Sequence, residues 1–225
     1  MASARGETSF SVDLVILTAL TSELAVLLQK AKGTSGRWSL PWSAPARNET
    51  LSAVASRLAV SAVGDEPAWS EQLGGFGDGR AHPSGAPLSV AFVSTVAHET
   101  ATAERGFHWF PARDLPPIAP RHGLMVHAGI EALRMAIDRA PIAFRLLPEK
   151  FTLTELQRMY ELLLGKRLHK ASFRRSLQAA ALVSPTDEWR SEGRGRPAQL
   201  YTFAPRRKRK TPRGVRFDLL SGAGV

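Results

Sequence analysis

The sequence contains no cysteine, which excludes disulfide bonds and cysteine-ligated zinc sites. It has no apolar run near the roughly 20 residues that a membrane-spanning helix needs. Its N-terminal stretch also lacks the basic, apolar and small-residue order of a signal peptide. We therefore expect a cytoplasmic protein, and the excess of arginine over lysine together with abundant alanine favours a bacterial source. Its 225 residues suit one large domain or two small ones around a hydrophobic core.

Acidic side chains are scarce in one part of the chain. Residues 141–216 hold 18 Lys and Arg against 6 Asp and Glu, whereas the other residues hold 12 against 14. The whole formal charge of +10 therefore arises in this segment. Such an asymmetry indicates an anionic partner, nucleic acid first and a membrane surface second. Five consecutive basic residues, Arg206–Lys210, would form an arm for that partner.

The first 140 residues carry patterns of both strands and helices. Apolar, β-branched runs predict strands at Val12–Leu20 and Leu88–Val96, with a shorter strand at Phe107–Phe110. Helical spacing predicts two helices, Glu49–Val63 behind an N-cap at Asn48 and His122–Arg139. Loops are expected at 34–47 and 74–87, and an extended piece at 141–147.

The pattern changes after Pro148. Thr152 and Glu155 have the spacing of a capping box, and Gly165 is a natural helix end. Between them the apolar residues form one stripe: Leu153, Leu156, Tyr160 and Leu163. A second helix is predicted over Ala171–Leu182, and it buries Phe173, Leu177, Ala180 and Ala181.

The other side of the second helix carries groups suited to the DNA major groove. Arginine forks bind guanine or phosphate, and glutamine reads adenine; these residues are Lys170, Arg174, Arg175 and Gln178. A solvated basic face would have the same composition. The following Gly193–Pro197 segment favours DNA binding over a solvated basic face, because arginines on a thin hairpin suit a narrow minor groove. Helix, turn, basic helix and basic hairpin is the order of a winged helix-turn-helix.

The segment Leu147–Phe203 closely resembles the C-terminal domain of the Nudix-related transcriptional regulators. The residues that carry the resemblance are FTLTELQ in the first helix, FRR in the second and GRGRPAQLY in the wing. The resemblance implies an α+β protein, with an N-terminal Nudix-like mixed-sheet α/β/α domain and a C-terminal winged helix-turn-helix domain. We place the domains at 10–140 and 141–205, followed by a basic tail at 206–225.

The Nudix box itself is degenerate. Aligned from Ser43, where the motif has glycine, it keeps Glu49, Arg57 and Gly64. The three other carboxylate positions hold Leu58, Ser61 and Ala62. Because Mg²⁺ needs hard oxygen ligands, we expect no hydrolase activity, no catalytic residue, no metal and no cofactor. His98, His108, His122 and His127 lack metal-site spacing, so we expect them to be structural or exposed.

The resemblance implies a homodimeric, DNA-binding repressor whose degenerate domain senses a nucleotide or sugar-linked metabolite, with ADP-ribose and genes of NAD metabolism as the family precedent. The nucleoid would be its location. Three other hypotheses stay open: a Nudix-type pyrophosphohydrolase tethered to DNA, an RNA-binding or membrane-surface protein that uses the basic arm, and a DNA-binding protein with no effector.

The candidate site residues fall into two groups. Those expected at the double-stranded DNA operator are Thr152, Thr154, Lys170, Ser172, Arg174, Arg175, Gln178, Arg194, Arg196 and Gln199. Those expected at the effector are Arg57, Arg37 and Trp42. For Arg57, the favoured hypothesis is a structural salt bridge to a neighbour such as Glu49.

Overall fold

The structure is a computed structural model, and it describes residues 10–20, 23–30, 37–77, 79–97, 102–191 and 197–204. The chain divides into two compact units. Unit 1 consists of residues 1–17, 25–96 and 100–132, and unit 2 of residues 18–24, 97–99 and 133–225. No helix in the described ranges is long and apolar enough to cross a membrane.

A mixed sheet organises unit 1. Its strand order is β3-β2-β1-β6-β5, and β4 and β7 pair with β1 and β2 respectively. Only β1 and β6 are recorded as a parallel pair; the other recorded pairs are antiparallel. The strands are β1 (Phe10–Leu20), β2 (Glu23–Lys30), β3 (Trp38–Ser39), β4 (Trp42–Ser43), β5 (Trp69–Phe76), β6 (Leu88–Thr95) and β7 (Phe107–Pro111). The predicted mixed sheet is confirmed.

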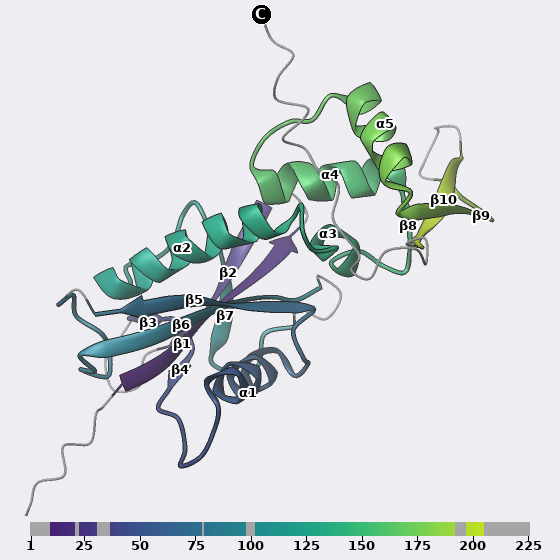
Figure 1. Cartoon of the computed structure of the whole chain (residues 1–225). Helices are drawn as coiled ribbons and strands as arrows, with labels where there is room; N and C mark the ends of the chain where they lie inside the picture. Colours follow the sequence, from purple (N-terminus) through teal and green to yellow (C-terminus); the bar gives the residue numbers. More distant parts are fainter. Residues whose placement is uncertain are drawn as a thin grey trace, which may run out of the picture. The chain divides into compact units, whose positions relative to one another are not determined.

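Two helices cover opposite faces of this sheet (Figure 1), α1 (Leu51–Val63) and α2 (Pro120–Ala136). β1 is buried on both faces, which explains its continuous apolar run. Leu14 and Ile16 of β1 pack into one core with Leu58 of α1. On the other face a Cβ at Gly129 of α2 would lie 3.1 Å from Val15 Cγ1, so the glycine allows this helix to approach the sheet closely.

Several expectations for local structure around the mixed sheet were wrong. Thr50 caps α1 through its hydroxyl, whereas the expected cap Asn48 has a φ of 65° and lies outside the helix. The loop predicted from residue 74 begins inside β5, a polar edge strand whose register shifts between Gln72 and Gly74. Its composition is atypical of strands, so only pairing with β6 defines it. β2 was not predicted.

Unit 2 is a winged helix-turn-helix. It contains α3 (Ile142–Arg145), β8 (Lys150–Thr152), α4 (Leu153–Leu164), α5 (Lys170–Ala180), β9 (Val183–Arg190) and β10 (Ala198–Phe203), with sheet order β8-β10-β9. The extended piece expected at 141–147 is instead the single helical turn α3, held by burial of its apolar side chains. Aromatic rings form the core: Tyr160 lies 5.7 Å from Phe173, and Phe144 lies 5.9 Å from Phe151.

Candidate nucleic-acid interface and effector domain

The first helix of the helix-turn-helix begins with the predicted capping box. Glu155 N–H donates to Thr152 Oγ1 at 3.1 Å, and Thr152 N–H donates to Glu155 Oε2 at 2.6 Å. Gly165 ends the helix with a φ of 67°. Arg190 of β9 donates to Glu155 Oε1 at 2.7 Å and to Lys150 O at 3.2 Å. The two bonds of Arg190 join the wing to the start of α4. The residue Thr152 is 6% exposed, and its hydroxyl is engaged by Glu155 N–H.

The turn between α4 and α5 is held by two side chains of α4. Leu168 N–H donates to Glu161 Oε1 at 2.9 Å, and Gln157 Nε2 donates to Leu168 O at 3.0 Å. Gln157 also donates to Glu161 Oε1 at 3.0 Å. The backbone of Leu168 is thereby fixed one residue before His169, the N-cap of α5. The sequence reasoning did not assign this role to Glu161 or Gln157.

α5 separates its buried and polar residues as predicted. Phe173 and Leu177 are buried in the domain, at 0% and 1% exposure. The polar candidates on the other side are all exposed: Lys170, Arg174, Arg175 and Gln178. Ser172 is half-buried and lies 3.5 Å from His169 Nδ1, and Thr154 on α4 is exposed. α5 therefore offers two guanidinium groups and an amide to a groove.

The wing is the β9–β10 hairpin. Gln199 of β10 is half-buried and donates to Thr186 O at 3.2 Å. Trp189 lies opposite Gln199 in the strand pairing and is 57% exposed. The sequence reasoning missed this residue, although an aromatic residue beside a Gly/Arg turn was a usable signal. Arg194, Arg196 and the Arg206–Lys210 arm lie outside the described residues.

The degenerate Nudix helix in unit 1 is a packing element. Leu58 and Ala62 lie in the hydrophobic core at 9% and 0% exposure, and Ser61 is exposed. Arg57 donates through Nε to Glu49 Oε1 at 2.8 Å and through Nη2 to Oε2 at 3.0 Å. This ion pair, with a bond from Ala46 N–H, lowers the pKa of Glu49 to about 2. The expected salt bridge of Arg57 is confirmed.

The other two candidate effector residues lie near β3 and β4. Arg37 is exposed and precedes β3. Trp42 on β4 is half-buried, and its ring packs edge-on against His82, with 5.3 Å between ring centroids. His82 in turn belongs to a buried cluster that the sequence reasoning did not identify.

Asp13 of β1 lies at the centre of that cluster. His82 Nε2 is 2.7 Å and His122 Nε2 is 3.0 Å from Asp13 Oδ1, and all three side chains are fully buried. Burial alone raises the pKa of Asp13, but the two histidine hydrogen bonds outweigh it and hold the pKa well below the ordinary range. For His122, burial lowers the pKa despite the neighbouring carboxylate. The residues are far apart in sequence, so no spacing motif marked them.

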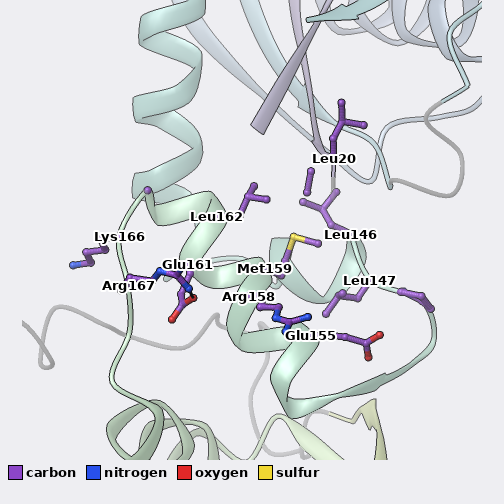
Figure 2. Close-up of a pocket in the computed structure, with 13 residues that line it drawn as sticks. Leu20, Leu146, Leu147, Glu155, Arg158, Met159, Glu161, Leu162, Lys166 and Arg167 are labelled. Atoms are coloured by element: carbon purple, nitrogen blue, oxygen red, sulfur yellow. Dashed lines mark hydrogen bonds and ion pairs between the residues drawn. The ribbon is translucent and has the colours of Figure 1, made fainter. Parts of the chain in front are cut away.

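Unit 2 also contains a pocket of about 710 Å³. Figure 2 shows Met159 and Leu162 of α4 together with Leu20, Leu146 and Leu147. Charged side chains lie at the same pocket: Glu155, Arg158, Glu161, Lys166 and Arg167. Two of these carboxylates are engaged, Glu155 with Arg190 and Glu161 with Arg167. The pocket is therefore mainly apolar, with part of its charge neutralised internally.

Comparison with known proteins agrees with this architecture. Residues 143–203 match the NrtR DNA-binding winged helix domain. Over 211 residues the chain is 29% identical to the ADPR responsive transcriptional repressor NtrR of Acinetobacter baylyi, a match that spans 86% of this chain and 81% of that protein.

Solved structures show the same two-domain likeness. NrtR of Shewanella oneidensis complexed with a 27mer DNA matches with a TM-score of 0.74 and 29% identity, over 87% of this chain and 94% of that one. A MutT/nudix family protein from Enterococcus faecalis shares the fold at a TM-score of 0.65 and 20% identity, over 87% and 86%. The chain is therefore similar over most of its length to transcriptional regulators of the NrtR kind, with a Nudix-like domain followed by a winged-helix domain, and its residues 143–203 match their DNA-binding winged helix.

Proposed function

We propose that this regulator is a homodimeric repressor that leaves its operator when its Nudix-like domain binds ADP-ribose or a related nucleotide, and that it does not hydrolyse this effector. The observation that carries the proposal is the contrast between α5, which exposes Arg174 and Arg175, and α1, which has replaced its metal ligands. The name of the Acinetobacter baylyi relative supports repression and the effector class.

DNA recognition is assigned to α5 and the wing. Arg174, Arg175 and Gln178 would contact base edges in the major groove, because they lie on one exposed side of a helix whose other side is buried. Six of the remaining candidates would position the domain on the DNA backbone: Thr154, Lys170, Ser172, Arg194, Arg196 and Gln199. Thr152 would act indirectly, because it is buried and its hydroxyl caps α4. The assigned domains are 10–140 for the effector, 141–205 for DNA and 206–225 for the basic tail.

Effector binding without hydrolysis follows from the chemistry of α1. A working Nudix helix would need carboxylates at Leu58, Ser61 and Ala62 to hold Mg²⁺ beside a pyrophosphate. Here two of these positions are in the core, and Glu49 is engaged by Arg57. Binding would depend on shape and on groups such as Trp42 and Arg37. Arg57 would contribute only by leaving its ion pair with Glu49.

A homodimer would couple the two domains. A winged helix covers one half-site, and two copies related by a two-fold axis would read a palindromic operator. An effector that changes the spacing of the two recognition helices would lower operator affinity. Such a protein would be located on the bacterial nucleoid when bound to DNA.

The test begins with selection of genomic fragments that the full-length protein binds, which defines the operator. Fluorescence anisotropy of the operator is then measured with ADP-ribose, NAD and AMP, each with Mg²⁺ and with a chelator. We expect one nucleotide to release the DNA equally well in both conditions, with the nucleotide recovered intact. Release that requires Mg²⁺, or turnover of the nucleotide, would contradict the metal-free mechanism.

A matched pair of variants separates the two parts of this proposal. Trp42→Ala should weaken nucleotide-induced release while operator binding stays within about twofold of the parent, because the change lies in unit 1. Arg175→Ala should weaken operator binding while nucleotide affinity, measured by calorimetry without DNA, stays unchanged. If Trp42→Ala responds like the parent, Trp42 is not an effector residue.

A further inference from the structure

A set of buried polar groups surrounds Asp13 on the face of the sheet that α2 covers. It contains six side chains, none more than 7% exposed: Ser11, Asp13, His82, Ser89, Arg121 and His122. They come from β1, β6, the first turn of α2 and the segment between β5 and β6. We call this set the Asp13 cluster. Burial without hydrogen bonds would be costly for each member, so the direction of every bond matters.

The backbone determines the protonation of His122. Leu40 N–H donates to His122 Nδ1 at 3.1 Å. A nitrogen that accepts a hydrogen bond carries no proton, so the proton of the neutral ring is on Nε2. Nε2 faces Asp13 Oδ1 at 3.0 Å and donates to it.

The same logic applies to His82. Ser84 N–H donates to His82 Nδ1 at 3.1 Å, and Ser84 Oγ lies 2.6 Å from that nitrogen. Ala86 N–H donates to Ser84 Oγ at 3.1 Å, and the hydroxyl proton is free to point at His82 Nδ1. The ring proton of His82 is therefore also on Nε2, which faces Asp13 Oδ1 at 2.7 Å.

A chain of hydroxyls reaches the other carboxylate oxygen. Ser11 donates to Asp13 Oδ2 at 2.7 Å, so Ser89, which is 2.8 Å from Ser11 Oγ, donates to Ser11. Arg121 Nη1 donates to Ser89 Oγ at 3.3 Å and to Ala86 O at 2.7 Å. The Ser89 and Ser11 hydroxyls thus donate in turn toward Asp13, and they link one buried cation to one buried anion.

We propose that the Asp13 cluster is a metal-free, acid-sensitive latch, in which an ionised Asp13 is held by two neutral histidines in the Nε2–H form and one added proton opens the network. The residue types are those of a two-histidine, one-carboxylate metal site. A metal bound to Nε2 would move the ring proton to Nδ1. A proton on Nδ1 would face the backbone N–H of Leu40 or Ser84, so that two donors would oppose each other.

An added proton meets the same obstacle. Protonated His122 would point Nδ1–H at Leu40 N–H, donor against donor. This event breaks the hydrogen bond that joins the segment between β3 and β4 to α2. Trp42, a candidate effector residue, packs on His82, so the opened latch would also shift Trp42. This consequence depends on the proposed function.

The charged and titratable groups that face one another here come from three parts of unit 1. They are Asp13 from β1, His82 from the segment before β6, and Arg121 with His122 from α2. Burial of the His122 ring disfavours a second cation most strongly, and the positive charge of Arg121 adds to this effect. The latch is therefore closed at neutral pH and opens only on acidification.

Histidine NMR on the full-length protein tests the latch without reference to any effector. Long-range ¹H–¹⁵N correlations of ¹⁵N-histidine protein at pH 7.5 should show two of the six rings as pure Nε2–H tautomers. Zn²⁺ at one equivalent should leave both unchanged, and elemental analysis of the purified protein should find less than 0.1 metal ion per chain. An Nδ1–H tautomer or an imidazolium at His82 or His122 at pH 7.5 would overturn the proposal, and so would stoichiometric metal in the purified protein.

Acid titration and variants complete the test. The His122 ring should remain neutral below pH 6 and then change together with the amide signal of Leu40. His122→Gln and His82→Gln assign the rings, and His127→Gln on the exposed side of α2 is the control. If the buried variants do not fold, the parent titration still decides. Titration of the His122 ring near the ordinary value of about 6.5 would refute the latch.

Discussion

Helices α1 and α5 differ in where the positions that could carry function lie. Both bury an apolar side against their unit, but α1 has Leu58 and Ala62 in the core where a hydrolase would need carboxylates, whereas α5 leaves Arg174 and Arg175 exposed. Charged groups retained at the surface are available to a ligand, and positions absorbed into the core are not. The comparison teaches that the loss of one function and the presence of another can be recognised from where polar side chains lie.

The sharpest way to break this comparison is to place a charge on α1, at a buried position and at an exposed one. Ala62→Glu should destabilise unit 1 by about 3–5 kcal/mol, because position 62 is fully buried and the new carboxylate has no partner. Chemical denaturation followed by tryptophan fluorescence measures the loss. Ser61→Glu is the control. Ser61 is the exposed neighbour of Ala62, so this substitution should change stability by less than about 0.5 kcal/mol. Equal effects of the two variants would show that α1 is not packed as described.

The next effect is on DNA binding by α5. Arg174→Ala and Arg175→Ala should each weaken specific operator binding by about 1–3 kcal/mol if the arginine contacts a base edge. Both are exposed, so the thermal unfolding of the protein should not change. Arg105→Ala, an exposed arginine of unit 1, serves as the control. Parent-like operator binding by both α5 variants would refute the assignment of the recognition helix.

Acid should distinguish the units. The folded-state pKa of His122 is depressed, so below the unfolded value of about 6.5 the unfolded chain binds a proton that the folded unit 1 rejects. Stability is therefore complete above that value and is lost as pH falls, at most about 1.4 kcal/mol per pH unit for this group. In unit 2, burial raises the pKa of Glu161, but hydrogen bonds from Leu168, Gln157 and Arg167 lower it below its ordinary value of 4.5.

Between pH 7 and 5.5, unit 1 should thus weaken while the Glu161 contribution in unit 2 stays intact. Amide hydrogen exchange, resolved by unit, measures both at once. Equal loss of protection in α2 and α4 over this range would contradict the assignment.

The smallest effect concerns the two helix ends of the helix-turn-helix. α4 ends on Gly165 with a φ of 67°, but α5 ends on Ala181 with a φ of 49°, a conformation that costs an alanine about 1 kcal/mol. Ala181→Gly should raise the stability of unit 2 by up to about that amount. Gly165→Ala should lower it, because an alanine would have to adopt the left-handed φ of 67° and would displace the Arg134 guanidinium. Differential scanning calorimetry gives the sign for each variant.

Local interactions explain why the sequence predicted unit 2 well. The capping box of Thr152 and Glu155, the end at Gly165 and the split of α5 into buried and exposed sides depend on residues at most a few positions apart. Such patterns are visible in a linear sequence. The same holds for β1, whose unbroken apolar run marks a strand buried on both faces.

Long-range contacts decided the rest. β5 is a strand only because β6 pairs with it, and its polar residues and glycines carry no strand signal. Asp13, His82 and His122 meet across up to 109 positions of sequence, so no spacing motif records their cluster. The sequence by itself determined which residues carry charge and where α4 begins and ends. The tertiary structure alone decided which of those residues are buried together, because burial and hydrogen-bond direction depend on elements that are distant in the chain.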